Sequence, residues 1–156
     1  GYGAEMADLH FPPDALFRRL RPYANPLDFI ALDPAFGQLR DGFQDDMSRA
    51  RAVAPEIDDP GHRLHLLPVA PWARRAGGVL ANELARAAPD QAHALLTRLP
   101  AGGFVVSVRA PLTRRQGADD LCRVFPGGGG RPAAAGINEL ADSDYEAFVA
   151  AFLAAF

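Results

Sequence analysis

The stretch Phe125-Pro-Gly-Gly-Gly-Gly-Arg-Pro-Ala-Ala-Ala-Gly136 decides how the rest of the chain is interpreted. Glycine reaches positive φ without steric cost, but it also loses the most conformational entropy when it becomes ordered. A run of four is therefore worth ordering only where the backbone bends sharply or approaches something closely. The small side chains that follow keep such an approach open, and Arg131 carries a planar charged fork suited to phosphate or carboxylate. By itself, the stretch fits either an anion-binding loop or a flexible linker.

The segments that flank the glycines favour a structured loop. Residues 117–125 read as a short helix or a strand, with the helix preferred, and residues 133–138 read as extended chain. Ser143-Asp-Tyr-Glu146 has the spacing of a capping box, and an apolar stripe at helical spacing runs from there to Phe156. This last helix must pack on something, so the glycines are held at both ends.

The region from residue 62 alternates between strand and helix patterns. An apolar run at 64–69 indicates a buried strand, and 72–87 indicates a helix that is stopped by Pro89. Two strands follow at 92–97 and 103–109, joined by a turn with two glycines. In the second strand, Ser107 and Arg109 share one face. The order predicts an α/β fold with a mixed β-sheet flanked by helices.

The first sixty residues have a different sequence pattern, in which predicted helices are separated by prolines. Asp33-Pro34 predicts the start of an amphipathic helix that runs to about residue 50. In that helix Asp45-Asp46 is expected on an exposed face. Asp58-Asp-Pro-Gly61 marks a turn. We therefore expect two units, a helical connector over 1–60 and an α/β domain over 61–156.

Composition excludes several functional classes. The net charge of −3 gives no global basic field for nucleic acid, so any anion site must be local. All 16 basic residues are arginine, and the single cysteine, Cys122, is expected to be a small core residue. The single cysteine fits a reducing, cytoplasmic location. No signal peptide or membrane span is apparent.

Three kinds of anion site can be tested on the glycine stretch. A Walker-type loop requires lysine, which the chain lacks. A dinucleotide fingerprint fits formally as Gly128-x-Gly130-x-x-Ala133, but it needs a helix directly afterwards. The third kind is a nest of backbone N–H groups with arginine partners. Arg109 and Arg131 are the candidate partners, and Ser107 is a hydroxyl donor.

Gly77-Gly78 stands inside the predicted helix at 72–87. It favours close packing of that helix on the sheet, with ligand approach from Arg74 or Asn82 as the alternative.

Three motifs together resemble a known family. They are Gly102-Gly-Phe-Val-Val-Ser-Val-Arg109, Ala118-Asp-Asp-Leu-Cys-Arg-Val-Phe125 and Gly128-Gly-Gly-Arg-Pro-Ala-Ala-Ala-Gly136. Their order and spacing look like the DHH-associated C-terminal domain of DHH-family phosphoesterases, which has a Ser-x-Arg strand and a Gly-Gly-Gly-His-x-x-Ala-Ala-Gly signature. The likeness covers about residues 62–156, and residues 1–60 resemble the connector to the catalytic domain.

The resemblance implies that this chain is the substrate-binding portion of a metal-dependent enzyme that hydrolyses phosphodiester bonds. Arg131 stands where the family usually has histidine, which leaves anion binding intact but changes what else the site can contact. The partners implied are a nucleotide or short single-stranded oligonucleotide, the N-terminal DHH catalytic domain, and a homodimer. The implied substrate- and phosphate-binding residues are Ser107, Arg109, Gly128, Gly129, Gly130, Arg131, Ala135 and Gly136.

Catalytic and metal-binding residues are not expected in this chain. The family's two-metal centre, with manganese or magnesium, is held by an Asp-His-His motif in the N-terminal domain, and no such motif occurs here. His62 and His65 are expected to face opposite sides of a strand. The chain alone is therefore expected to bind without hydrolysing. The alternatives are a protein-interaction or oligomerisation module and a dinucleotide cofactor-binding domain.

Overall fold

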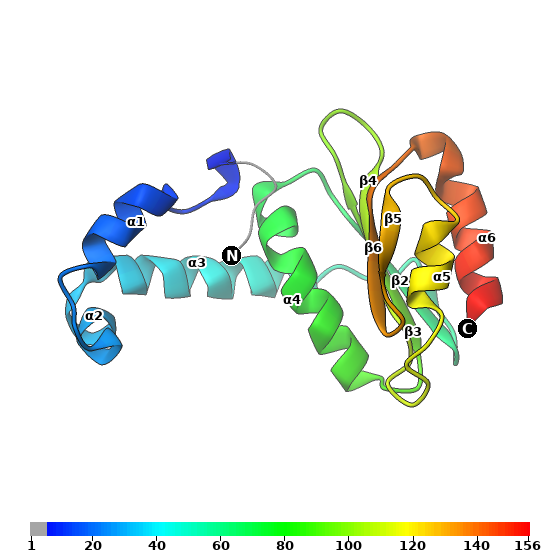
Figure 1. The fold of residues 1–156 in the computed structure, drawn as a ribbon, viewed down its shortest axis with the longest axis horizontal. Coiled ribbons are helices and arrows are strands. Elements are labelled where there is room, and N and C mark those ends of the chain that lie inside the picture. Colours follow the sequence, from blue (N-terminus) through cyan, green and yellow to red (C-terminus); the bar gives the residue numbers. More distant parts are fainter. Residues whose placement is uncertain (1–5) are drawn as a thin grey trace.

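The computed structural model describes residues 6–156, whose centre is a six-stranded mixed sheet with helices on both faces (Figure 1). This confirms the predicted fold class. The strands are Ile57–Asp58 (β1), His62–Leu67 (β2), Ala92–Arg98 (β3), Phe104–Arg109 (β4), Gly128–Arg131 (β5) and Ala134–Leu140 (β6). The α-helices are Pro13–Leu20 (α1), Pro26–Leu32 (α2), Pro34–Arg51 (α3), Pro71–Ala87 (α4), Ala118–Arg123 (α5) and Tyr145–Ala155 (α6). Short 3-10 turns occupy Met6–Asp8 (η1) and Asp142–Asp144 (η2).

The sheet has the order β1-β2-β3-β4-β6-β5. β2 and β3 are parallel and are joined by α4, as a parallel pair requires a long crossover. β3 and β4 form the predicted antiparallel hairpin. The chain then passes through α5, returns as the edge strand β5, and turns back as β6, which lies between β5 and β4.

Two apolar layers lie on the two sides of the sheet. One contains Phe148 and Phe152 of α6, packed with α5 residues on Val106, Val108 and Ile137. The other contains α4 residues such as Leu80, packed between α3 and the strand residues Leu67 and Leu95. The strands are therefore covered by α5 and α6 on one face and by α4 on the other.

The structure differs from the sequence-based expectation in the glycine stretch and at the start of α6. Gly128–Arg131 is a strand rather than the expected loop, because it pairs with β6. The capping box is wrong: α6 is preceded by η2, its N-cap is Asp144, and no side chain caps it. The apolar stripe is correct, with Phe148 and Phe152 fully buried.

The described part of the connector, residues 6–60, contains three α-helices, and two of these begin after a capping side chain. The Asp33 carboxylate accepts from the Ala35 N–H, and Pro34 occupies the first helical position. Asn25 caps α2 in the same way through the Leu27 N–H. The sheet begins at Ile57, which pairs with Leu64, so it starts before the domain boundary expected at residue 61. No helix within residues 6–156 combines the length and apolar character that a membrane-spanning segment requires.

Candidate functional site

Part of one sheet face is left open by the helices. α4 packs on β3 and β4, whereas α5 packs on β5 and β6 from the opposite side. On the face of the sheet opposite α5, α4 covers β3 and part of β4. The same face of β6 and β5 is largely not covered by a helix (Figure 1). We call the uncovered part of this face the open face. The strand register assigns to it Ser107, Arg109, Gly129, Arg131, Ala134 and Gly136.

The register places the two predicted arginines at the same level of the open face. Arg109 of β4 is opposite Ala134 of β6, and Ala134 is opposite Arg131 of β5. The side chains of Arg109 and Arg131 thus flank one alanine, which leaves room above it. Ser107, Gly136 and Gly129 form the next such row. The sheet therefore brings the serine, both arginines and two small residues onto one surface.

Arg109 is half-buried, and its hydrogen-bond partners are neutral. Its Nε donates to Asn82 Oδ1 at 2.9 Å, and its Nη1 donates to the Val108 carbonyl at 3.1 Å. Burial lowers the pKa of the Arg109 guanidinium below its usual value, and the positive charge of Arg131 lowers it further. Within the described chain, neither arginine lies within ion-pair distance of a carboxylate. The open face therefore carries two uncompensated positive charges, which suits an anion.

The glycines of β5 have different surroundings. A Cβ on Gly128 would lie 1.8 Å from the Cys122 carbonyl oxygen, so α5 can pack there only against glycine. Gly130 has a φ of +150° and its Cβ would lie 2.5 Å from Ala135 Cα. A Cβ on Gly129, by contrast, would meet nothing within 4 Å. Packing explains Gly128 and Gly130, and it does not explain Gly129.

The eight predicted site residues thus divide into two groups. Five lie on the open face, namely Ser107, Arg109, Gly129, Arg131 and Gly136. The other three, Gly128, Gly130 and Ala135, belong to the alternate positions that face the α5 side. Because successive strand residues point to opposite sides of a sheet, no ligand on the open face meets both groups.

Asn82, which the sequence analysis named only as an alternative, lies beside the open face. It lies on α4 one turn after Gly78, and its side chain holds Arg109. Gly77 is buried against β3, where a Cβ would lie 3.6 Å from Leu95 and Thr97 atoms, which is an ordinary packing distance. A Cβ on Gly78 would meet nothing within 4 Å. Arg74 lies elsewhere, paired with Asp8.

The structure contradicts the dinucleotide fingerprint. That motif needs a helix N-terminus directed at the pyrophosphate immediately after the glycines. Here the glycines form β5, and the chain continues into β6. The formal match Gly128-x-Gly130-x-x-Ala133 is therefore a coincidence of spacing.

Cys122, His62 and His65, the other candidate polar residues, lie in positions that packing explains. Cys122 is fully buried, and burial raises the pKa of its thiol to about 11. His62 stacks edge-on against Phe152, whereas His65 lies on the α4 side beside Leu80, so the two face opposite sides as predicted. Within residues 6–156, no three His, Cys, Asp or Glu side chains are grouped so as to hold a metal.

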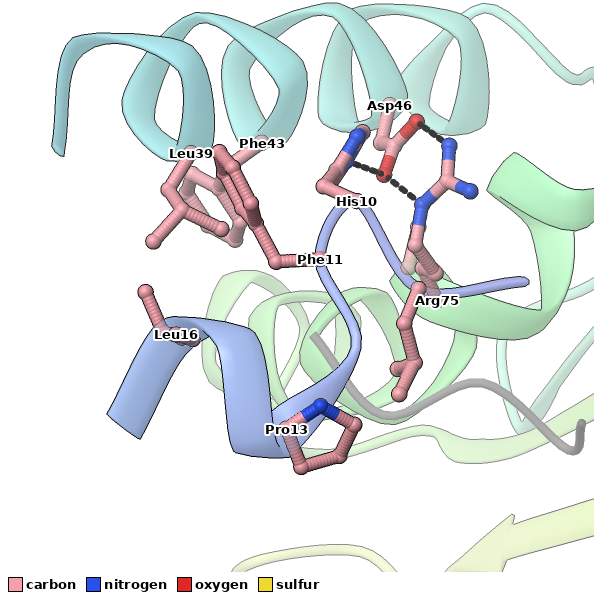
Figure 2. A pocket seen from close by; sticks show the side chains of 10 residues that line it. His10, Phe11, Pro13, Leu16, Leu39, Phe43, Asp46 and Arg75 are labelled. Carbon is pink, nitrogen blue, oxygen red and sulfur yellow. Dashed lines mark hydrogen bonds and ion pairs between the residues drawn. The ribbon is translucent and has the colours of Figure 1, made fainter. Parts of the chain in front are cut away.

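A pocket of about 380 Å³ lies between the connector and α4 (Figure 2). Its walls are mostly apolar, and its polar end is the Asp46–Arg75 ion pair, with two bonds of 2.7 Å. The prediction that Asp46 is exposed is wrong, because Arg75 of α4 draws it into a site where it is only 4% exposed. His10 Nε2 lies 3.7 Å from the same carboxylate. The charges in this pocket compensate each other, unlike those of the open face.

Comparisons with known proteins agree on the fold. No family model matches the chain, and no curated protein does. The solved structure of RecJ with Mg²⁺ from Thermus thermophilus matches with a TM-score of 0.60 and 21% identity, over 96% of this chain and 23% of that one. A DHH-domain member of the s1p family of ribosomal proteins matches with a TM-score of 0.55 and 14% identity, over 81% and 33%.

A pGpG-specific phosphodiesterase, PggH from Vibrio cholerae, matches at a TM-score of 0.46 and 15% identity, over 94% of this chain and 47% of its own. The chain thus spans less than half the length of each of these proteins. These structural neighbours are DHH-family proteins, and the likeness is one of fold.

Proposed function

We propose that the chain is the substrate-binding part of a DHH-type phosphoesterase and that its open face binds phosphate groups of a nucleotide or short single-stranded oligonucleotide. The observation that carries this proposal is the pairing of two uncompensated arginines, Arg109 and Arg131, across Ala134 on an uncovered sheet face. Guanidinium groups bind phosphate oxygens through charge-assisted bonds, often two at a time. The fold shared with DHH-family proteins supports the same ligand class.

The proposal assigns recognition to this chain and hydrolysis to another domain. The described residues offer no set of three potential metal ligands, so they do not fit a divalent-metal centre. In the intact enzyme, the N-terminal DHH domain would hold manganese or magnesium and would receive the phosphodiester gripped here.

The roles on the open face follow from exposure. Arg109 is held by two hydrogen bonds and is half-buried, so it offers a fixed charge to one phosphate. Arg131 is exposed and reaches from the edge strand, so it can follow a flexible ligand. Ser107 and Gly129 line the row beside them, where a hydroxyl and bare backbone allow close approach.

The test is a titration of the chain with adenosine 5′-monophosphate and with a short single-stranded oligonucleotide. Arg109→Ala should weaken binding at least about tenfold, as expected for loss of charge-assisted hydrogen bonds. Arg131→Ala should weaken it less. Each change should also reduce the salt dependence of oligonucleotide binding by about one unit of slope. Arg40→Ala, an exposed arginine of the connector, is the matched control and should leave binding unchanged.

The alternatives give different results. If the open face serves only protein interaction or oligomerisation, the unmodified chain will bind neither probe. With manganese present, the proposal expects binding without cleavage, and cleavage of the oligonucleotide by the purified chain would refute the division of labour.

A further inference from the structure

Most of the surface arginines that hydrogen-bond to a side chain bond to a carboxylate, whereas the side-chain partner of Arg109 is neutral. Arg51 pairs with Glu83, and Arg63 pairs with Asp58. Arg109 instead uses the side-chain oxygen of Asn82, a neutral acceptor, although it is more buried than Arg51. A half-buried charge without a carboxylate is costly. The hydrogen bond to Asn82 is therefore unusual for this chain.

The geometry fixes which atoms of both side chains remain available. Asn82 Oδ1 accepts from Arg109 Nε, and Arg109 Nη1 donates to the Val108 carbonyl. These bonds leave Nη2 without a hydrogen-bond partner among residues 6–156. Since the Asn82 oxygen is engaged, its amide NH₂ group is directed elsewhere and keeps two donors. The N–H groups of Arg109 Nη2 and of the Asn82 amide are therefore the donors left over at this contact.

We propose that Asn82 is a positioning residue for phosphate binding: it orients Arg109 toward the open face without neutralising it. This inference rests on the proposed function. An aspartate at position 82 could make the same hydrogen bond, and it would bind Arg109 more tightly. It would also cancel the charge that a phosphate must meet, and it would place a negative charge beside that phosphate.

The distinction between orientation and neutralisation makes the inference testable. A residue needed only to stabilise Arg109 could be replaced by aspartate without loss, because the ion pair would be at least as strong. If position 82 must instead leave the charge of Arg109 uncompensated, its replacement by aspartate will weaken phosphate binding. The two roles therefore predict opposite effects for Asn82→Asp on phosphate binding.

The experiment compares Asn82→Asp, Asn82→Ala and Arg109→Ala in a titration with adenosine 5′-monophosphate. We expect Asn82→Asp to weaken binding at least about tenfold, nearly as much as Arg109→Ala, and Asn82→Ala to weaken it severalfold. The double variant Asn82→Asp/Arg109→Ala should bind at least as weakly as Arg109→Ala, because no arginine then neutralises the carboxylate beside the phosphate. Asn25→Asp is the control for the added charge, because aspartate caps α2 as well as asparagine does. Binding by Asn82→Asp that equals or exceeds that of the unmodified chain would overturn the inference.

A second measurement needs no ligand. The Arg109 Nε–H resonance, identified by its loss in Arg109→Ala, should exchange slowly with water in the unmodified chain and faster in Asn82→Ala. Equal exchange rates would overturn the inference alone, with the proposed function intact. If the unmodified chain binds neither adenosine 5′-monophosphate nor the oligonucleotide, the proposed function fails and the phosphate role of Asn82 fails with it. The exchange rates then still show whether Asn82 holds Arg109.

Discussion

Gly128 and Gly129 are neighbours on β5, but only Gly128 is restricted to glycine by packing. Gly128 faces α5, where a Cβ would lie 1.8 Å from the Cys122 carbonyl oxygen. Gly129 faces the open side, where the space around a Cβ is empty to 4 Å. The first glycine is required by packing. The second is explained if a ligand approaches the backbone closely at that point.

Alanine substitutions separate these two requirements. Gly128→Ala should destabilise the fold by roughly 2–3 kcal/mol, the cost of overpacking that displaces α5. Gly129→Ala should change the free energy of unfolding by less than about 0.5 kcal/mol, as at other unobstructed positions. It should nevertheless weaken nucleotide binding. Denaturant unfolding and titration with adenosine 5′-monophosphate measure the two effects. Unchanged binding by Gly129→Ala would show that no ligand comes close to this backbone.

At the residue scale, the sequence pattern placed Ser107 and Arg109 on one face, as the register has them, but it treated the glycines as equivalent. That prediction assumed a loop, in which successive N–H groups converge on one anion. In a strand they alternate, so Gly129 and Gly136 share a face with Arg131 while Gly128 and Gly130 do not. Asn82 was harder to assign, because its partner Arg109 is 27 residues away.

At the scale of elements, local patterns predicted α4, α6 and the β3–β4 hairpin, whose apolar spacing is strong. They did not predict β5, because glycine has low strand propensity. This strand exists through its pairing with β6, which carries the interior residues Ala135 and Ile137. Residues 128–131 thus form a strand because of tertiary pairing, which intrinsic strand propensity does not predict.

The contact between α4 and the central strands predicts a pH dependence. His65 is 5% exposed, and burial lowers its pKa from 6.5 to about 4. The unfolded chain therefore binds a proton more readily than the folded one. The contribution of neutral His65 to the free energy of unfolding should be fully present above pH 6.5, and it should be lost as the pH falls toward 4. The loss is on the order of 3 kcal/mol for this group. His93 on the adjacent strand also has a lowered pKa through burial and acts in the same direction.

Unfolding by denaturant at pH 7.5 and pH 5 tests this dependence. His65→Leu removes the titrating group, so the difference in stability between the two pH values should shrink. His10→Leu is a control, since His10 lies on the connector and is more exposed. A pH difference in His65→Leu equal to that of the unmodified chain would contradict the assignment to His65.

At the scale of the whole molecule, the connector is attached to the sheet domain by buried charges. Asp46 of α3 receives two bonds from Arg75 of α4, and the two side chains are only 5% and 14% exposed. Arg75 also donates to the Asp8 carbonyl, which ties the segment before α1 to the same point. The helical pattern of the sequence could not indicate this ion pair. It places Asp46 outside the apolar stripe of α3, and it carries no information about the arginine on α4 that pairs with it.

Asp46→Ala should destabilise the protein by about 3–5 kcal/mol, because it leaves the Arg75 charge buried and unpaired. Asp45→Ala is the matched control one residue earlier: it removes an exposed pair with Arg49, and such pairs contribute little. Replacing both partners, as in Asp46→Leu/Arg75→Met, should recover most of the loss, because no unpaired charge remains. Denaturant unfolding of the four proteins measures these differences. Equal effects of Asp45→Ala and Asp46→Ala would show that the connector is held by apolar packing, whereas the expected gap would make the Asp46–Arg75 pair the contact that fixes the connector to the domain.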